Sequence, residues 1–507
     1  MPLPIINAME AAHRDGWALT FPDVRLKTGY SEVMPRGVEL ESRFTRKVPL
    51  KVPIVSAAMD TVTEMDTAIA MAQLGGLGVL HRNLSDRELL RQFYRVKFNL
   101  HGRIRTPITI KPDQTVAEVL DMMKRERYEF HTFPVVDSKD GKLVGIVGGD
   151  DFDFCQDTTS PVSSIMTREI VSAGPGISAE QAYALMIQNK RKTIPLIDSD
   201  EKLVGMYVWK DVKRIVKGET KRYNLDDSGR LRVGIAVGIR DDIEEFLGPF
   251  VEHGLDVAVH QSAHAATKSM LDTLERIKRA YPNLEVAVGN VSEPEDAVRL
   301  ADNGADGILV GQGGGSICTT RVVAGVGCPQ VTVVYNCTRA LEKAGHDVPV
   351  CSDGGIEYSG DIPIAIGAGA ESVMVGKLLA GTEEAPGEKI TIGGRQFKVY
   401  RGMGSEAAMK AHAASRERYR QNDNGPDKLV PEGIEGAVPI RGKLEDVLYQ
   451  YTGGLRAGMG YVGARTIQEL REKAKFHRTT SAGTQENHPH GVLMTREPPN
   501  YASRGEK

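Results

Sequence analysis

The fold is decided by residues 285–310, which read EVAVGNVSEPEDAVRLADNGADGILV. Both ends of this stretch, Glu285–Val288 and Gly307–Val310, are short apolar runs of the kind found in buried strands. Between them, Glu293–Asn303 is typical of a helix. A strand, a helix and a second strand of these lengths indicate a βαβ unit with parallel strands.

The same rhythm recurs on both sides of this unit. Helical stretches lie between most of the strands, for example Asp66–Leu74 and Ala265–Ala280. The further strands are predicted at Val52–Ala57, Gly75–Leu80, Arg232–Val237, Asp256–Val259, Pro349–Cys351 and Ser372–Val375. With the two strands above they make eight, and eight βα units in sequence predict an α/β fold, a closed (β/α)8 TIM barrel.

An internal repeat interrupts the rhythm between about residues 105 and 215. Each copy has two apolar runs after an amphipathic helix, the helices being Val116–Arg125 and Ala179–Gln188. The runs are Phe133–Asp137 with Lys142–Gly145, and Ile194–Asp198 with Lys202–Gly205. The predicted division is a barrel over 1–104 and 218–507 that carries an inserted domain over 105–217.

The repeat resembles a tandem pair of CBS modules (a Bateman domain), which sense adenine or guanine nucleotides. In that family an Asp lies three residues after a Thr or Ser that follows the second strand. Asp151 and Asp211 match the Asp, but Gly148 and Val208 stand at the hydroxyl positions. The residues leave two roles open, a nucleotide-binding pair or a structural insert that helps assembly.

Composition excludes several classes of function. The chain of 507 residues has 64 Lys and Arg against 67 Asp and Glu, so its net charge of −3 gives no footprint for nucleic acid or an anionic membrane. Its five cysteines form neither a disulfide framework nor a CxxC zinc motif. No secretory signal and no apolar run of membrane-spanning length occurs, so we expect a reducing cytoplasm.

Glycine is in excess, with 54 residues, and the excess falls in loops that follow strands. After the sixth strand comes GQGGGSICTTR, residues 311–321. Barrel enzymes carry their sites on such loops. Cys318 is flanked there by hydroxyls and followed by Arg321, a cation able to stabilise a thiolate, so it is a candidate nucleophile. The alternative is a small buried residue.

Glycine turns also follow the seventh and eighth strands, at Ser352–Ile356 and Val375–Gly381. This is the usual phosphate site of these barrels, with backbone N–H groups as donors. Asp353 can accept hydrogen bonds from a ribose diol, and Tyr400 adds a phenolic donor. Together these features indicate a nucleoside monophosphate held beside a nucleophilic cysteine. Either glycine turn taken alone could equally be an ordinary strand-to-helix turn without a ligand.

Six motifs carry a family resemblance. They are SAAMDTVT at 56–63, GSICTTR at 315–321, SDGGI at 352–356, LAGTE at 379–383, YRGMGS at 400–405 and KLVPEGIEG at 428–436. Through them the chain resembles IMP dehydrogenases over nearly its whole length, including the position of the insert. Their superfamily also contains GMP reductase.

The resemblance implies a two-part reaction. The Cys318 thiolate attacks C2 of IMP, and hydride passes to NAD⁺. A mobile flap then closes, and a water activated by Arg418, with Thr320 and Tyr419 assisting, releases XMP. The flap corresponds to the polar, glycine-rich segment from about 401 to 445, which we expect to be irregular.

The resemblance also assigns binding residues. Substrate contacts fall on Ser56, Met59, Ser316, Asp353, Gly355, Gly376, Lys377, Tyr400, Met403, Gly404 and Glu432. Cofactor contacts fall on Gln261, Ser262, Asn290 and Gly311. Carbonyls of Gly313, Gly315 and Cys318 would hold K⁺ with Glu486, Asn487 and His488 of the partner subunit. Such a site requires an oligomer, and the resemblance implies a homotetramer while leaving octamers open.

Three positions depart from the family pattern. These are three places in the chain: Gln261 replaces an Asp that contacts the nicotinamide ribose, Gln312 and Gly314 of the catalytic loop replace Ile and Pro, and Lys377 replaces a small residue. Three functions therefore stay open: an IMP dehydrogenase, a GMP-reductase-type enzyme that uses NADPH on GMP or a modified purine nucleotide, and a nucleotide-binding homologue without turnover. The pair Arg418-Tyr419 favours the first, since the second relies on a flap Glu.

Overall fold

The structure, a computed structural model, describes residues 8–100, 103–104, 107–126, 131–422, 428–496 and 498–501. These residues fall into two compact units. The first contains the chain up to Lys97, Arg222–Asp226 and the chain from Leu231 onward. The second contains Phe98–Lys221 with Asp227–Arg230. Among the described residues, every helix is too short or too polar to cross a membrane.

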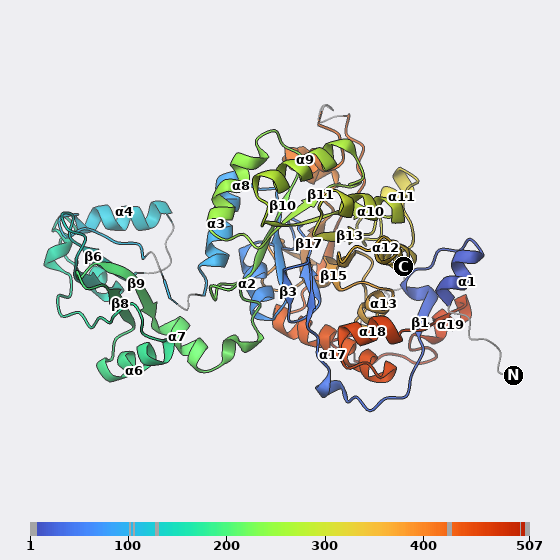
Figure 1. Ribbon diagram of the computed structural model, residues 1–507, viewed down its shortest axis with the longest axis horizontal. Helices are drawn as coiled ribbons and strands as arrows, with labels where there is room; N and C mark the ends of the chain where they lie inside the picture. Colours follow the sequence, from blue (N-terminus) through green and yellow to red (C-terminus); the bar gives the residue numbers. More distant parts are fainter. Residues whose placement is uncertain are drawn as a thin grey trace. The chain divides into compact units, whose positions relative to one another are not determined.

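The first unit is a closed barrel of eight parallel strands, which confirms the predicted fold (Figure 1). In space the strands run in the order β10, β11, β12, β13, β14, β15, β4 and β5, and β5 pairs with β10 to close the ring. Their bounds are β4 Ile54–Ser56, β5 Leu77–Leu80, β10 Val233–Val237, β11 Val257–Gln261, β12 Glu285–Val291, β13 Gly307–Val310, β14 Val350–Asp353 and β15 Ser372–Val375. All eight predicted strands are present.

Helices surround the strands, as Figure 1 shows for α8, α9, α10 and α12. The long ones turn an apolar stripe toward the barrel; α9, for example, buries Met270, Leu274 and Ile277. The helices are α2 Met65–Gln73, α3 Asp86–Lys97, α8 Ile243–Glu252, α9 Lys268–Ala280, α10 Pro294–Asp302, α11 Thr320–Val323, α12 Gln330–Lys343, α13 Asp361–Gly367, α14 Lys377–Ala380, α17 Leu444–Val462 and α18 Ile467–Lys473.

The barrel interior is filled, so ligands can enter only at its mouth. Its core includes Val79, Val259, Leu309 and Met374 from four different strands. A hairpin of β2 (Ser42–Arg43) and β3 (Pro49–Leu50) adds apolar side chains to the same core. A Cβ on Gly307, the first residue of β13, would lie 2.7 Å from the Phe44 carbonyl oxygen, so the hairpin closes the amino-terminal end of the strands.

The segment after the eighth strand that was predicted to be irregular contains helices and a strand, which corrects that expectation. A three-stranded antiparallel sheet is formed by β16 (Lys389–Ile392), β17 (Arg395–Arg401) and β18 (Glu435–Pro439). Two short helices, α15 (Glu406–Ala411) and α16 (Ala413–Arg418), lie between β17 and β18 in the chain. We call residues 401–445 the flap.

Two segments from opposite halves of the chain pair beside the barrel. Strand β1 (Val24–Leu26) pairs antiparallel with β19 (Phe476–Arg478), so the amino-terminal segment is tied to the carboxyl-terminal one. Helix α1 (Ala8–Arg14) precedes β1, and α19 (Ser481–Glu486) follows β19.

The second unit consists of two similar halves. Hairpin β6–β7 (Phe133–Val136, Leu143–Val147) belongs to the first half and β8–β9 (Thr193–Ile197, Leu203–Val208) to the second. Each hairpin has one register shift at the same place, and each half has its own apolar cluster. The helices are α4 Val116–Glu126 and α5 Gly149–Asp153, then α6 Ala179–Asn189 and α7 Trp209–Val216. The internal repeat is thus a repeat of structure, and its CBS assignment stays a prediction.

Candidate active site

A pocket of about 300 Å³ opens where the loops after six barrel strands meet the flap. Its wall contains most of the predicted site: Met59, Gln261, Ser262, Asn290, Gly311, Gly313, Gly315, Ser316, Cys318, Thr320, Asp353, Gly355, Gly376, Lys377, Tyr400, Met403, Arg418, Tyr419 and Glu432. Residues more than 370 positions apart in the chain therefore line one cavity.

Two predicted substrate residues lie behind this wall. The Ser56 side chain is fully buried, and its hydroxyl accepts a hydrogen bond from Thr63 Oγ1 at 2.8 Å. Gly404 packs under the Tyr419 ring, where a Cβ would lie 2.5 Å from Tyr419 Cζ. Both residues therefore lie behind the side chains that line the pocket and do not line it themselves.

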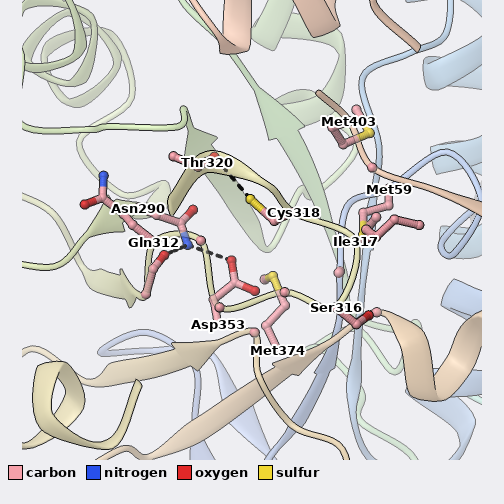
Figure 2. Close-up of a pocket in the computed structure, with 18 of the residues that line it drawn as sticks. Met59, Asn290, Gln312, Ser316, Ile317, Cys318, Thr320, Asp353, Met374 and Met403 are labelled. Atoms are coloured by element: carbon pink, nitrogen blue, oxygen red, sulfur yellow. Dashed lines mark hydrogen bonds between the residues drawn. The ribbon is translucent and has the colours of Figure 1, made fainter. Parts of the chain in front are cut away.

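The candidate nucleophile lies in the loop after β13. This loop begins at Gly311, which has a φ of +135°. A Cβ at this position would lie only 2.4 Å from the Asp353 carbonyl oxygen, so the position admits only glycine. Cys318 Sγ lies 3.1 Å from Thr320 Oγ1 (Figure 2). The thiol and the hydroxyl can therefore exchange a proton at the place where a substrate would bind.

Arg321 also shapes the loop, a role that the sequence did not predict. Its Nε donates to the Gln312 carbonyl oxygen at 2.9 Å, and its Nη2 donates to the Cys328 carbonyl oxygen. The described hydrogen bonds of this guanidinium hold the two ends of the loop together, and none of them reaches Cys318. Burial lowers the pKa of Arg321, while the nearby Cys328 and Cys318 oppose this electrostatically. The support of the Cys318 thiolate by Arg321 therefore stays a prediction, and the hydrogen bonds add a role in shaping the loop.

A polar network surrounds Asp353 at the end of β14. Asn290 Nδ2 donates to Asp353 Oδ2 at 2.7 Å (Figure 2). Gln261 Nε2 donates to the same oxygen at 3.2 Å. Burial raises the pKa of Asp353 above its ordinary value, although these hydrogen bonds and nearby Arg418 oppose the rise. Asp353 is thus a preoriented acceptor for hydroxyl groups.

The loops after β14 and β15 carry the glycine turns. Gly355 has a φ of +79°, and Gly376 faces the Tyr400 hydroxyl, which a Cβ there would approach to 3.0 Å. Burial raises the pKa of Tyr400 to about 12, so this phenol stays a donor at neutral pH. Lys377 Nζ lies 3.4 Å from Glu357 Oε1. Backbone N–H groups, a phenol and an ammonium group together suit a phosphate.

The flap places Arg418 and Tyr419 in the pocket wall. Arg418 Nη1 donates to Gln261 Oε1 at 2.9 Å, and the Arg418 carbonyl oxygen accepts from Ala263 N at 3.1 Å. Burial raises the pKa of Tyr419 to about 12, while the positive charge of Arg418 opposes the rise. The described part of the flap is therefore docked on the loop after β11.

Glu417 anchors the same turn from the other side. Its carboxylate pairs with Arg82, from the loop after β5, and accepts a hydrogen bond from Ile239 N at 3.2 Å. Burial lowers the pKa of Arg82, Glu417 opposes this, and the like charge of Arg418 adds to it. The sequence offered no signal for this pair, because neither residue belongs to a motif that we singled out.

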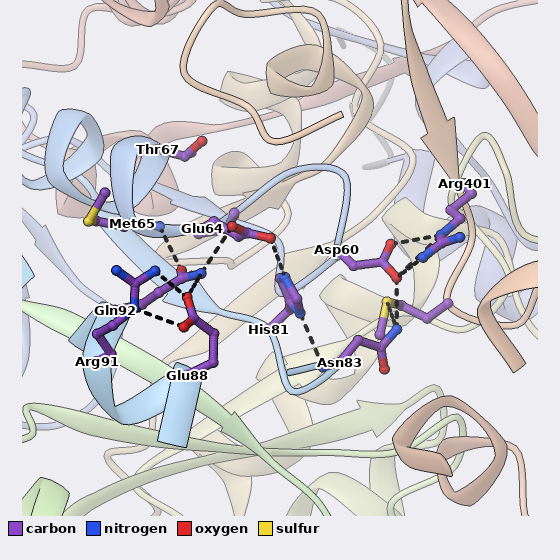
Figure 3. Close-up of polar contacts among 12 residues, drawn as sticks. Asp60, Glu64, Met65, Thr67, His81, Asn83, Glu88, Arg91, Gln92 and Arg401 are labelled. Carbon is purple, nitrogen blue, oxygen red and sulfur yellow. Dashed lines mark hydrogen bonds and ion pairs between the residues drawn. The ribbon is translucent and has the colours of Figure 1, made fainter. Parts of the chain in front are cut away.

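A further polar cluster joins the flap to the loops after β4 and β5 (Figure 3). Asp60 accepts from Arg401 Nη2 and from Asn83 Nδ2, both at 2.8 Å. Asn83 Nδ2 also donates to Ser415 Oγ at 3.0 Å. Burial opposes ionisation of Asp60, yet the hydrogen bonds from Arg401 and Asn83 outweigh it and leave the pKa of Asp60 below its ordinary value.

The predicted potassium ligands fall in two places. Gly313, Gly315 and Cys318 share the loop at the pocket, while Glu486, Asn487 and His488 lie outside its wall. His488 Nδ1 lies 3.1 Å from the Tyr501 hydroxyl. Groups of three or more His, Cys, Asp or Glu that could hold a metal are absent from the described residues. Because the prediction assigns the tail residues to another subunit's site, it stays a prediction.

Residues 18–490 match the family model described as the IMP dehydrogenase / GMP reductase domain. The chain belongs to this family. Within the family it is 47% identical to an inosine-5'-monophosphate dehydrogenase of Aquifex aeolicus over 489 residues, which are 95% of this chain and 97% of that protein. It is 44% identical to the inosine-5'-monophosphate dehydrogenase of Bacillus subtilis over 485 residues, 95% of this chain and 97% of that protein.

Solved structures from the GMP reductase side of the family are also similar. One is a cysteine-to-alanine variant of GMP reductase from Trypanosoma brucei in complex with guanosine 5'-monophosphate. It has a TM-score of 0.83 and 36% sequence identity, and covers 94% of this chain and 98% of that one. The family resemblance drawn from the motifs is confirmed, and both of its activities occur among the relatives.

Proposed function

We propose that the protein is an IMP dehydrogenase, an NAD-dependent oxidoreductase that converts IMP to XMP in guanine nucleotide biosynthesis. The observation that carries this proposal is the docked flap, in which Arg418 and Tyr419 line the pocket that contains Cys318. Glu417 instead faces away from that pocket, in its pair with Arg82. The identity of 44–47% to curated IMP dehydrogenases supports the same activity.

The chain's groups supply the first half of the reaction. Cys318 Sγ, as thiolate, forms a bond to C2 of IMP, whose phosphate lies against the Gly355 and Gly376 turns and whose ribose diol donates to Asp353. NAD⁺, when bound, accepts the hydride that leaves C2. Gln261, Ser262, Asn290 and Gly311 form the wall on which it would rest, and their amide, hydroxyl and backbone groups suit a ribose and a carboxamide.

The second half is hydrolysis. Arg418, with Thr320 and Tyr419, orients a water and takes its proton while the water oxygen bonds to C2 and the Cys318 thiolate leaves. The sum is IMP, NAD⁺ and water giving XMP, NADH and a proton. Met403 and Glu432 face the base. We also propose K⁺ at the carbonyls of Gly313, Gly315 and Cys318, since oxygen donors in a glycine loop suit a hard cation.

The test is NADH formation from IMP, NAD⁺ and K⁺, followed by its absorbance. Steady NADH formation by the protein and its loss in Cys318→Ala would establish the activity. No NADH at saturating substrates would overturn it. Oxidation of NADPH with GMP would then identify the GMP-reductase-type activity that the Trypanosoma brucei structures represent. Inactivity in both assays with retained nucleotide binding would leave a homologue without turnover.

We further propose a homotetramer in the cytoplasm. Val322, Val323 and Val326, just beyond Cys318, have exposures of 87%, 48% and 55%, which is unusual for valines beside an active site. A neighbouring subunit that covers them could supply Glu486, Asn487 and His488 to the K⁺ loop. Light scattering on the purified protein distinguishes a tetramer from an octamer. The five cysteines are free in the structure, and a reducing compartment would keep them so.

The role of residues 105–217 rests on nucleotide binding. In the proposed sensor, Asp151 and Asp211 would hold the ribose of an adenine or guanine nucleotide. Asp151 Oδ2 already accepts from Gly148 N at 2.7 Å, and the Asp211 side chain is buried. Calorimetry of the full chain with ATP and with GTP decides between the two roles: heat that Asp211→Ala removes identifies a sensor, and no heat identifies a structural insert.

A further inference from the structure

Two glutamines stand where the family pattern has other residues, and both border the cofactor side of the pocket. Gln261 ends β11, and Gln312 follows β13 by two residues. Their side chains are 3% and 8% exposed. A buried primary amide must find partners for its oxygen and its NH₂ group, so the contacts of each glutamine show what it holds.

Gln261 connects the flap to the barrel. Its Oε1 accepts from Arg418 Nη1 at 2.9 Å. Its Nε2 donates to Asp353 Oδ2 at 3.2 Å and to Asn290 Oδ1 at 3.1 Å. One neutral amide thus accepts from a cation and donates to a carboxylate. An Asp at this position could only accept, and it would bring a second carboxylate beside Asp353.

Gln312 secures the loop beneath the flap. Its Nε2 donates to the Ala263 carbonyl oxygen at 2.8 Å and lies 3.4 Å from His264 Nδ1, and its Oε1 accepts from Ser292 Oγ at 2.6 Å. The apolar Ile of the family pattern could make none of these bonds. The amide therefore holds residues 263–264 in place.

The loop that Gln312 holds is the one that receives the Arg418 backbone. Ala263 N donates to the Arg418 carbonyl oxygen at 3.1 Å, and Ser262 Oγ donates to it at 3.3 Å. Arg418 is thus bound at its guanidinium by Gln261 and at its carbonyl by a loop that Gln312 supports. The two departures from the family pattern meet at one flap residue.

We propose that Gln261 and Gln312 form a seat for Arg418, in which Gln261 is a positioning residue for the hydrolytic half of the reaction. The proposal rests on the proposed function for the role of Arg418. Where the family uses an Asp for the cofactor ribose, this chain uses an amide that also holds the flap. The same side-chain oxygen serves the two halves of the cycle in turn.

Rapid mixing with IMP and NAD⁺ separates those halves, since the first turnover reports hydride transfer and the steady state reports hydrolysis. In Gln261→Ala we expect both rates to fall, because Gln261 also borders the proposed cofactor site. The steady-state rate should fall about tenfold further than the first turnover, the usual effect of losing a hydrogen bond to a charged group. The covalent adduct on Cys318 should accumulate, as seen by intact-protein mass.

Gln261→Glu is the matched variant, because it keeps the acceptor for Arg418 and loses the donor to Asp353. We expect its steady-state kcat within about threefold of wild type and its KM for IMP raised about tenfold by repulsion of Asp353. A Gln261→Ala variant that slows both halves equally, or neither, would overturn the positioning role.

Limited trypsin digestion measures how firmly the flap is docked, without requiring catalytic turnover. Arg416, Arg418 and Arg420 are tryptic sites in the flap. Gln261→Ala and Gln312→Ile should both be cut there several times faster than wild type, whereas the exposed Gln468→Ala on α18 should match wild type. Equal flap cleavage in all variants would refute the seat. Faster cleavage in a protein that makes no NADH would keep the seat and reject only the proposed activity.

Discussion

Replacing Glu417 by Gln tests whether the docked flap carries the hydrolytic step. The side chains of Glu417 and Arg82 are 13% and 11% exposed, so their ion pair lies largely out of water. The charge of Arg418 already disfavours a charged Arg82. Glu417→Gln removes the carboxylate between these two cations and keeps an acceptor for Ile239 N.

The size of the effect follows from this burial. Removing one partner of a buried ion pair costs about 3–5 kcal/mol, and the acceptor that Gln retains lowers this to roughly 2–3 kcal/mol. At about 1.4 kcal/mol per factor of ten, docking weakens roughly 30- to 150-fold. We expect the steady-state rate of NADH formation to fall roughly 30-fold or more, and the first turnover to stay within about twofold.

Stopped-flow absorbance of NADH measures both rates in one trace. The control is Glu275→Gln, which removes an exposed ion pair with Arg279. The side chains of Glu275 and Arg279 are 66% and 71% exposed. Such a pair contributes less than about 1 kcal/mol, and it lies on α9. A Glu417→Gln protein whose steady-state rate equals that of the control would refute the docking argument, and so would one whose first turnover falls in proportion.

Three more changes have defined outcomes. Gly404→Ala places a Cβ 2.5 Å from Tyr419 Cζ, so we expect Tyr419 to be displaced and the steady-state rate to fall about tenfold while the first turnover of the mixing assay persists. Tyr400→Phe removes the phenolic donor, which should raise the KM for IMP about five- to tenfold at constant kcat; an unchanged KM would exclude a contact with the phosphate. Burial lowers the pKa of His260 from 6.5 to about 4. As the pH falls from 6.5 to 4, this histidine therefore takes up a proton in the unfolded chain but stays neutral in the folded chain. The free energy of unfolding falls by about 3 kcal/mol over this range. Urea unfolding at several pH values should show this slope in the wild type and not in His260→Gln.

The barrel could be predicted because each strand carries its own evidence. Gly307–Val310 and Ser372–Val375 were located to the residue, since every side chain in them is buried and a glycine or polar residue ends the run. The pocket followed from the barrel, because the loops after the strands meet at one end whatever their distance in sequence. Cys318 and Asp353 came together on this ground alone.

The flap could not be predicted in the same way. Its helices α15 and α16 have six residues each, too short for a periodic signal. What holds α16 is tertiary, since Ser415 contacts Asn83 and Glu417 pairs with Arg82, more than 300 residues away in the chain. The loop-shaping role of Arg321 could not be predicted for a related reason: its partners at Gln312 and Cys328 are backbone carbonyls, which no side-chain pattern marks.

The roles of the residues that depart from the family pattern can be inferred only from the side chains and backbone groups that they contact. Lys377 has a counter-ion in Glu357, Gln312 bonds three groups in two loops, and Gln261 joins Arg418 to Asp353. A chain that had lost its activity would be free to lose such partners, whereas here each of these three altered residues has one. The reacting pair of Cys318 and Thr320 is unaltered. The changes thus fall on groups that hold the nucleotide and the flap, which favours an enzyme with modified binding over a homologue without turnover.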